Sequence, residues 1–200
     1  MGHPLLRAGL CAAALFFLSS CATTKIVGSW KDNTAKVPFR KLVVVGIFET
    51  ADTREVYEDE FRDRLKARGM EAYASRNLFP KHEIPGKDVA VAEFRKRGAD
   101  AVLVTRVLDS DRWKEVYRGK SYFVPVYYGV YGDYLGYAYT TARAADEGFA
   151  YTETNLYELD NGKLVWSARA DTEFKGRRYD LIKEFVKVAI GRLVEDGMIR

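Results

Sequence analysis

Three short apolar runs in the first half of the chain have the pattern of buried strands. Residues 40–49 (RKLVVVGIFE) and 99–108 (ADAVLVTRVL) are rich in β-branched side chains, and residues 70–75 (MEAYAS) form a shorter run. Runs of this length and composition are typical of strands covered on both faces. We therefore predict three strands here.

A helical period separates the first two of these strands. Tyr57, Phe61 and Leu65 recur at i, i+4 and i+8, which places them on one face of a helix. Asp52 is expected to cap the amino end of this helix and Gly69 to follow its carboxyl end.

A second, shorter helix is predicted over residues 88–97, with Val89 and Phe94 facing inward. It comes between the second and third predicted strands. The resulting order β-α-β-α-β indicates an α/β layer in which helices pack on a sheet.

The second half of the chain changes to the period of strands. Residues 112–128, 134–142, 148–159 and 163–170 are predicted to be strands, and Asp160-Asn161-Gly162 is typical of a hairpin turn. In the last of these strands, Leu164, Trp166 and Ala168 are expected to share one face.

The chain ends in an amphipathic helix over about residues 178–195. The prediction is a single α/β (α+β) domain: a β-α-β-α-β start, then antiparallel hairpins and a carboxy-terminal helix packed on the sheet. Its core is expected to contain Val43, Val45, Phe61, Leu65, Val102, Val104, Trp166 and Phe185.

The amino terminus has the features of a secretory signal peptide. A short basic start precedes the apolar run AGLCAAALFFL (residues 8–18), and small residues precede Cys21. A run of this length, at about 1.5 Å per residue, does not cross a bilayer core of about 30 Å. A conventional transmembrane helix is therefore excluded for this run.

Leu18-Ser19-Ser20-Cys21 resembles the lipobox of bacterial lipoproteins. The resemblance implies that residues 1–20 are removed and that Cys21 carries acyl chains. Because Ala22 and not Asp follows the cysteine, it also implies the outer membrane, facing the periplasm. The alternative is an ordinary secreted protein with a chance cysteine at the cut site. We predict a lipidated tether over residues 21–40, with a short strand near 25–30, and a periplasmic domain over 41–200.

Composition limits the chemistry. The formal net charge of +4 is too weak and too dispersed to indicate nucleic acid binding. Cys11 lies in the leader and Cys21 at the cut site, so a structural disulfide or a cysteine zinc site is not expected. His82 is the only histidine after the leader, which argues against a Ser-His-Asp triad and a multi-histidine metal site. We expect no catalytic residue, cofactor or metal.

Carboxylate pairs are the remaining route to catalysis. Asp109 and Asp111 stand at i, i+2, and Glu58, Asp59 and Glu60 lie on the first helix among arginines. We interpret both groups as solvated charges in local ion pairs.

Residues 122–139 (YFVPVYYGVYGDYLGYAY) are rich in Tyr and Gly. They are compatible with a hairpin that covers the sheet, a partner surface, a transmembrane hairpin in an oligomeric barrel, or a platform that stacks on glycans. Tyr is enriched at interfaces because its ring buries a large area and its hydroxyl remains polar. The candidate partner surface consists of Tyr122, Tyr127, Tyr128, Tyr131, Tyr134, Tyr137 and Tyr139.

Four pieces of the chain resemble a group of small, mostly uncharacterised periplasmic lipoproteins. They are GADAVLVTRV (98–107), the segment 122–139, TNLYELDNGKLVW (154–166) and the carboxy-terminal helix. The element order is also similar to the fold family of the TolB amino-terminal domain, the curli-secretion lipoprotein and the penicillin-binding-protein activator lipoproteins. The resemblance covers nearly all of the mature chain, carries over no catalytic residue, and implies envelope assembly or scaffolding.

The sequence thus predicts a non-enzymatic lipoprotein of the outer membrane that binds an envelope protein or glycan through its Tyr-rich strands. Two other classes stay open. A subunit of an oligomeric secretion or pore assembly would form rings. A carboxylate-based envelope enzyme would bring two acids together in a cleft.

Overall fold

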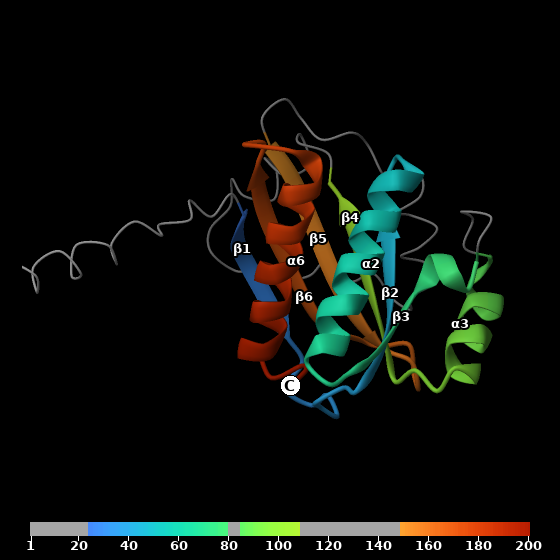
Figure 1. The fold of residues 1–200 in the computed structure, drawn as a ribbon. Helices are drawn as coiled ribbons and strands as arrows, with labels where there is room; N and C mark the ends of the chain where they lie inside the picture. Colours follow the sequence, from blue (N-terminus) through green and yellow to red (C-terminus); the bar gives the residue numbers. More distant parts are fainter. Residues whose placement is uncertain (1–23, 80–84, 109–148) are drawn as a thin grey trace, which may run out of the picture.

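In a computed structural model of the chain, residues 24–79, 85–108 and 149–200 are described, and they form one mixed α/β domain (Figure 1). The helices are α2 (Ala51–Ala67), α3 (Lys87–Lys96) and α6 (Arg178–Glu195), with a 3-10 turn at Ser75–Asn77. The strands of its single sheet are β1 (Thr24–Lys31), β2 (Lys41–Ile47), β3 (Glu71–Ala74), β4 (Ala101–Val107), β5 (Phe149–Glu158) and β6 (Leu164–Glu173).

The six strands lie in the order β1-β6-β5-β4-β2-β3. β2 pairs with β3 and β4 in parallel, whereas β4–β5, β5–β6 and β6–β1 are antiparallel. This arrangement confirms the predicted fold class, because helices connect the parallel strands and a hairpin connects β5 to β6.

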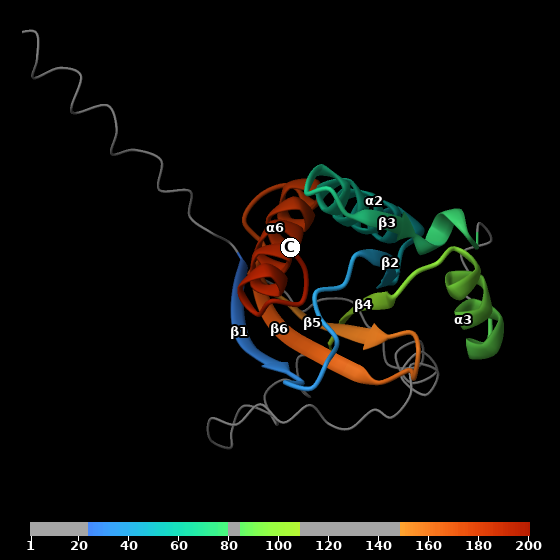
Figure 2. The ribbon, with the colours of Figure 1, turned by 90° about the horizontal axis from the view of Figure 1, so that it is seen from below.

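Helices α2 and α6 cover one face of the sheet side by side (Figure 2). The predicted apolar face of α2, formed by Tyr57, Phe61 and Leu65, is buried there. The ring of Phe185 on α6 packs against the ring of Tyr57, with 6.2 Å between the two centroids. Trp166 of β6 belongs to the same cluster and is fully buried. The eight residues predicted for the core are all buried.

Helix α3 covers part of the opposite face, over β2 and β4. Its inward residues are Ala90 and Phe94, both fully buried against Val43 and Val102. The prediction that Val89 faces inward is wrong, since Val89 is 60% exposed. Successive helical residues differ by about 100° in direction, so the i, i+4 pair Ala90 and Phe94 defines the face.

Thr50, not Asp52, caps the amino end of α2. The Thr50 hydroxyl accepts a hydrogen bond from the backbone N–H of Thr53 at 3.3 Å, and Asp52 lies in the first turn. At the other end, Gly69 has the predicted role, since its φ of 79° is a left-handed conformation that costs glycine little.

The segment expected to be a tether contributes the edge strand β1. The short strand expected near residues 25–30 is observed, and it pairs with β6 from Thr24↔Thr172 to Lys31↔Trp166. Thr24, the first described residue of the sheet, lies three positions after Cys21. No helix in the described ranges is long and apolar enough to span a membrane.

Candidate functional site

Most of the residues that the sequence singled out lie outside the described ranges, and the carboxylates at positions 58–60 lie inside them. Those outside are Cys21, His82, Asp109, Asp111, Tyr122, Tyr127, Tyr128, Tyr131, Tyr134, Tyr137 and Tyr139. The described part of the chain instead shows one end of the sheet with unusual surface chemistry.

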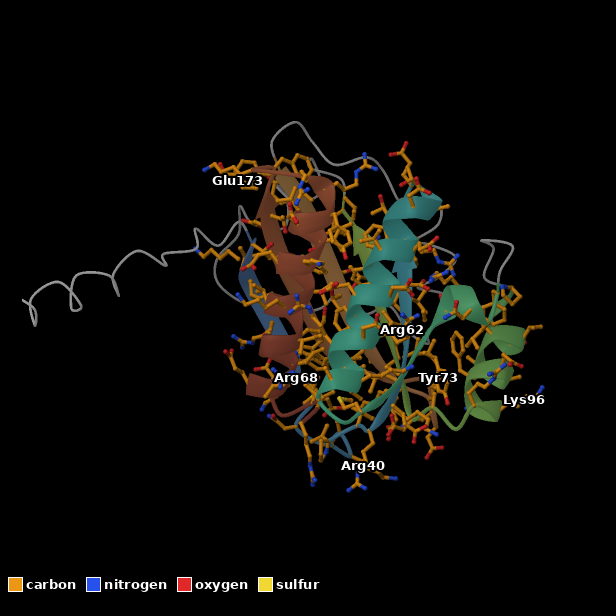
Figure 3. The ribbon with its side chains drawn as sticks, in the orientation of Figure 1. Arg40, Arg62, Arg68, Tyr73, Lys96 and Glu173 are labelled. Atoms are coloured by element: carbon orange, nitrogen blue, oxygen red, sulfur yellow. The ribbon has the colours of Figure 1, made fainter. Side chains whose placement is uncertain are left out.

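We call this end the entry end, because β1 begins there, and we define it by Thr24, Lys25, Phe149 and residues 172–179. Three adjacent strands align at it: Thr24 of β1 pairs with Thr172 of β6, and Phe149 of β5 pairs with Glu173. The hydroxyls of Thr24 and Thr172 are 2.9 Å apart and both residues are buried. Figure 3 labels Glu173 at this end and Arg40 and Arg68 at the opposite one.

Three large aromatic side chains are exposed at the entry end. Phe149 begins β5, Phe174 follows β6, and Tyr179 lies in the first turn of α6, with 40%, 44% and 47% of their surface exposed. Among the described residues, the other exposed large hydrophobic side chains are Val37, in the loop between β1 and β2, and Val89 on α3. The exposed aromatics are thus gathered at one end of the molecule.

A cavity of about 280 Å³ lies between the start of α2, the start of α6 and the sheet at the same end. Its apolar wall includes Phe48, Phe174, Leu181, Ile182 and Phe185. The carboxyl ends of β2 and β4 reach it, which is where open α/β sheets commonly bind ligands. Its chemistry suits an apolar group.

Glu49, Tyr57 and Arg178 are ionisable side chains that line this cavity, and of these Tyr57 is fully buried. Its hydroxyl shares a hydrogen bond of 2.6 Å with Thr105, whose hydroxyl shares one of 2.8 Å with Thr154. Burial raises the pKa of Tyr57 far above its ordinary value. The phenol therefore stays neutral at physiological pH and does not act as a base.

Glu58, the first of the predicted carboxylate candidates, is not solvated. It is fully buried, and its oxygens accept hydrogen bonds from the backbone N–H of Gly46 at 2.9 Å and of Arg76 at 2.8 Å. The Arg54 guanidinium at 2.9 Å and the Ser75 hydroxyl at 2.7 Å complete the set. With four donors around it, this carboxylate links α2 to β2 and to the end of β3.

The other two candidates on α2 behave as predicted. Asp59 forms ion pairs with Arg62 and Arg76, and Glu60 pairs with Arg64. The three acids of this group therefore do not converge on a common point.

A second buried charge cluster lies on the face opposite α2 and α6, across β4, β5 and β6. The Glu153 carboxylate receives Arg106 on one oxygen and Arg169 on the other, each at 3.0 Å from Nη2. All three side chains are at most 5% exposed. Such a bidentate arrangement fixes the register of three neighbouring strands and leaves the carboxylate no free position.

In the described ranges, no group of three or more His, Cys, Asp or Glu side chains is placed to hold a metal ion. Sequence reasoning did not find the Glu153 cluster or the aromatic entry end. The available signal for the first was a charged residue inside each of three apolar strands, at positions 106, 153 and 169.

No family model matches the sequence. Among solved structures, the chain is similar to the PelC dodecamer from Paraburkholderia phytofirmans, with 16% identity, a TM-score of 0.47, and coverage of 88% of this chain and 99% of that one. It is also similar to the lipoprotein GNA1162 from Neisseria meningitidis, with 15% identity, a TM-score of 0.40, and coverage of 78% and 97%. At such identities and TM-scores the likeness carries no functional argument. The similarity to the TolB amino-terminal domain stays a prediction.

Proposed function

We propose that this chain is a non-enzymatic lipoprotein of the bacterial cell envelope, anchored at Cys21 in the outer membrane and facing the periplasm. The observation that carries the proposal is the Leu-Ser-Ser-Cys box behind a short apolar leader. Two or three acyl chains on one cysteine anchor a protein stably, whereas one chain binds a membrane only marginally.

The start of the folded domain supports this position for the cut. Thr24 is held in the sheet by its pairing with Thr172. The described residues of β1, Thr24–Lys31, therefore all remain in the chain after the proposed cut.

Replacing Cys21 with Ser tests the anchor. The variant is expected to remain as an unacylated precursor, because the thiol that accepts the lipid is absent. Metabolic labelling with a palmitate analogue measures this directly. Cys11→Ser is the matched control, since it removes the other thiol of the chain and should leave labelling unchanged. Label that persists in Cys21→Ser would contradict the proposal.

A role without catalysis is supported by the surroundings of four described carboxylates. Glu58 and Glu153 are each saturated by donors, and Asp59 and Glu60 are held in ion pairs. Acids in such surroundings stabilise a fold and are poorly placed to donate or accept a proton from a substrate.

We further propose that the Tyr-rich segment 122–139 binds another envelope component, a protein or a glycan. The composition of the segment supports this, because interface aromatics are frequent anchoring residues. The described residues that flank it in the sequence end β4 and begin β5 at the entry end, where the Leu108 N–H donates a hydrogen bond to the Tyr151 carbonyl at 2.7 Å.

Crosslinking in cells tests the binding role. Changing Tyr127, Tyr128, Tyr131 and Tyr134 to Ser should remove most of the crosslinked partner and leave the melting temperature almost unchanged. Loss of folding in this variant would contradict a partner surface and favour a hairpin that covers the sheet. Ring oligomers that need detergent would instead favour a secretion or pore subunit.

A further inference from the structure

The entry end of the domain and the lipid anchor are separated by very little chain. Only Ala22 and Thr23 lie between Cys21 and Thr24, and Thr24 is fixed in the sheet by its pairing and its hydroxyl contact with Thr172. At about 3.3–3.6 Å per residue, this link reaches about 10 Å when fully extended. An anchored Cys21 therefore holds Thr24 within about 10 Å of the lipid interface.

The side chains beside Thr24 suit such a neighbour. Phe174 directly follows β6, the strand next to β1, Phe149 begins β5, the strand after that, and Tyr179 lies on α6; all three are exposed. Aromatic side chains favour the zone between water and hydrocarbon, where the ring enters the apolar region and a polar tip remains wet.

We propose that the entry end rests on the bilayer interface, with Phe149, Phe174 and Tyr179 inserted among the lipid headgroups. This proposal rests on the proposed lipid anchor at Cys21. It adds an orientation: the sheet stands end-on to the membrane, and the loops around Arg40 and Arg68 point away from it (Figure 3).

The charges at the entry end suit a surface of lipid phosphates. Glu173 pairs with Lys175 at 2.8 Å, and Asp180 pairs with Arg177 at 2.9 Å. Basic side chains nevertheless outnumber acidic ones at this end, because residues 25 and 178 are also basic. Exposed pairs of this kind contribute little to stability, so the long Lys175 and Arg177 side chains are able to turn toward lipid phosphates.

Single-cysteine reporters test the orientation in the intact lipidated protein. The mature chain has no cysteine other than Cys21, whose thiol carries the lipid, so an added cysteine is the one site that a thiol dye labels. Phe174→Cys and Tyr179→Cys place an environment-sensitive dye at the entry end. Val37→Cys is the matched control, because Val37 is exposed to a similar degree, 41%, and lies in the loop at the opposite end.

The labelled proteins are reconstituted in phosphatidylethanolamine vesicles that contain lipids with a quencher near the headgroup. We expect blue-shifted and quenched emission at positions 174 and 179, and the emission of a water-exposed dye at position 37. The shift should persist in high salt, because salt screens neither the acyl anchor nor the inserted aromatic side chains. Equal melting temperatures of the three variants establish that each is folded.

Water-exposed emission at 174 and 179 in protein that sediments with the vesicles would overturn the orientation and leave the anchor intact. Quenching at position 37 as strong as at position 174 would overturn it as well. Protein that carries no lipid and does not sediment would overturn the anchor, and the orientation with it. These results separate a failure of the inference from a failure of the proposed function.

Discussion

The two ends of the sheet are built differently. At the far end, formed by residues 32–40, 68–70, 97–100 and 159–163, short turns join neighbouring elements. Asp100 ties two of these turns together, because its carboxylate accepts the backbone N–H groups of Arg40 at 2.8 Å and Lys41 at 3.1 Å. The entry end instead exposes three aromatic rings beside an apolar cavity.

The residues toward the far end stabilise the fold, whereas the exposed residues at the entry end are available to bind another molecule or a membrane. Toward the far end, Trp166 is fully buried and its indole N–H donates to Asp196 at 2.8 Å. Hydrogen bonds from Arg192 and Trp166 outweigh the effect of burial and hold the pKa of Asp196 below its usual value. At the entry end, about half of the Tyr179 surface remains in contact with solvent.

The largest effect is expected at Trp166. Changing it to Ala should lower the free energy of unfolding by about 3–5 kcal/mol, because it removes a fully buried aromatic ring and leaves a cavity. Chemical denaturation at equilibrium measures the loss. A loss below about 1 kcal/mol would mean that this part of the core does not hold the domain together.

Glu58 lies between the two ends, and its replacement should have an intermediate effect. Glu58→Gln should cost about 1.5–3 kcal/mol, because it removes the charge opposite Arg54 and turns an amide donor toward other donors. Asp63→Asn is a matched control on the same helix, since Asp63 is exposed and its ion pair within the described ranges is with its neighbour Arg62. If Glu58→Gln is as stable as this control, the hydrogen bonds around Glu58 do not contribute measurably to the stability of the fold.

At the entry end, truncation should cost much less. Tyr179→Ser should lower stability by about 0.5–1 kcal/mol, the size of the lost cation–π contact with Lys183, which is 4.3 Å from the ring centroid. Thermal melts of the unlipidated chain measure this. A loss as large as that of Trp166→Ala would place Tyr179 in the core and would remove the contrast between the two ends.

The smallest changes in stability are expected from replacing two carboxyl groups, Asp32 and Asp171, whose pKa values are shifted in opposite directions. At the far end, hydrogen bonds from Lys163 and Thr34 lower the pKa of Asp32 to about 2. Next to the entry end, burial raises the pKa of Asp171 above its usual 3.8 despite nearby Lys25, and its Oδ1 has no hydrogen-bond partner in the described part of the chain.

The two asparagine variants should therefore depend on pH in opposite ways. The Asp32 carboxylate stabilises the fold above the ordinary pKa, and this contribution fades as the pH falls toward about 2. Asp32→Asn should thus lower the melting temperature at pH 7. The protonated form of Asp171 favours folding below the ordinary pKa, and this is lost as the pH rises through the raised value, so Asp171→Asn should raise the melting temperature at pH 7. The difference at Asp171 should shrink in melts near about pH 4, and the difference at Asp32 only as the pH falls further toward about 2. Changes in melting temperature of the same sign for both variants at pH 7 would contradict the opposite directions of the two pKa shifts.

Local pattern was enough to predict most elements. Helix α6 has the predicted bounds, and the stripe of α2 and the turn at Gly162, with its φ of 71°, are as expected. Periodicity and turn chemistry act over a few residues, so they are visible in the sequence.

Features that depend on register were predicted poorly. Trp166 and Leu164 were expected on one face, but Trp166 lies in the cluster under α2 and α6 and Leu164 in the cluster under α3. A register shift opposite Leu156 and Tyr157 inserts Val165 as an extra residue and reverses the alternation.

The entry end depends on pairing between strands that are far apart in the sequence. The entry end exists because Thr24, Phe149 and Phe174, which are far apart in the sequence, meet where β1, β6 and β5 align. Strand order is not visible in the alternation of a single strand. The lipobox, in contrast, is a contiguous motif, and the sequence alone was enough to predict it.

Hydrogen exchange compares both ends in one measurement. The lipidated protein in vesicles is measured against the Cys21→Ser chain, produced without the leader, in buffer. We predict slower exchange in vesicles for peptides that cover residues 149–151 and 173–180, and unchanged exchange for residues 32–40 and 159–163. Protection confined to the far end, or no difference at either end in protein that stays bound to the vesicles, would contradict the account.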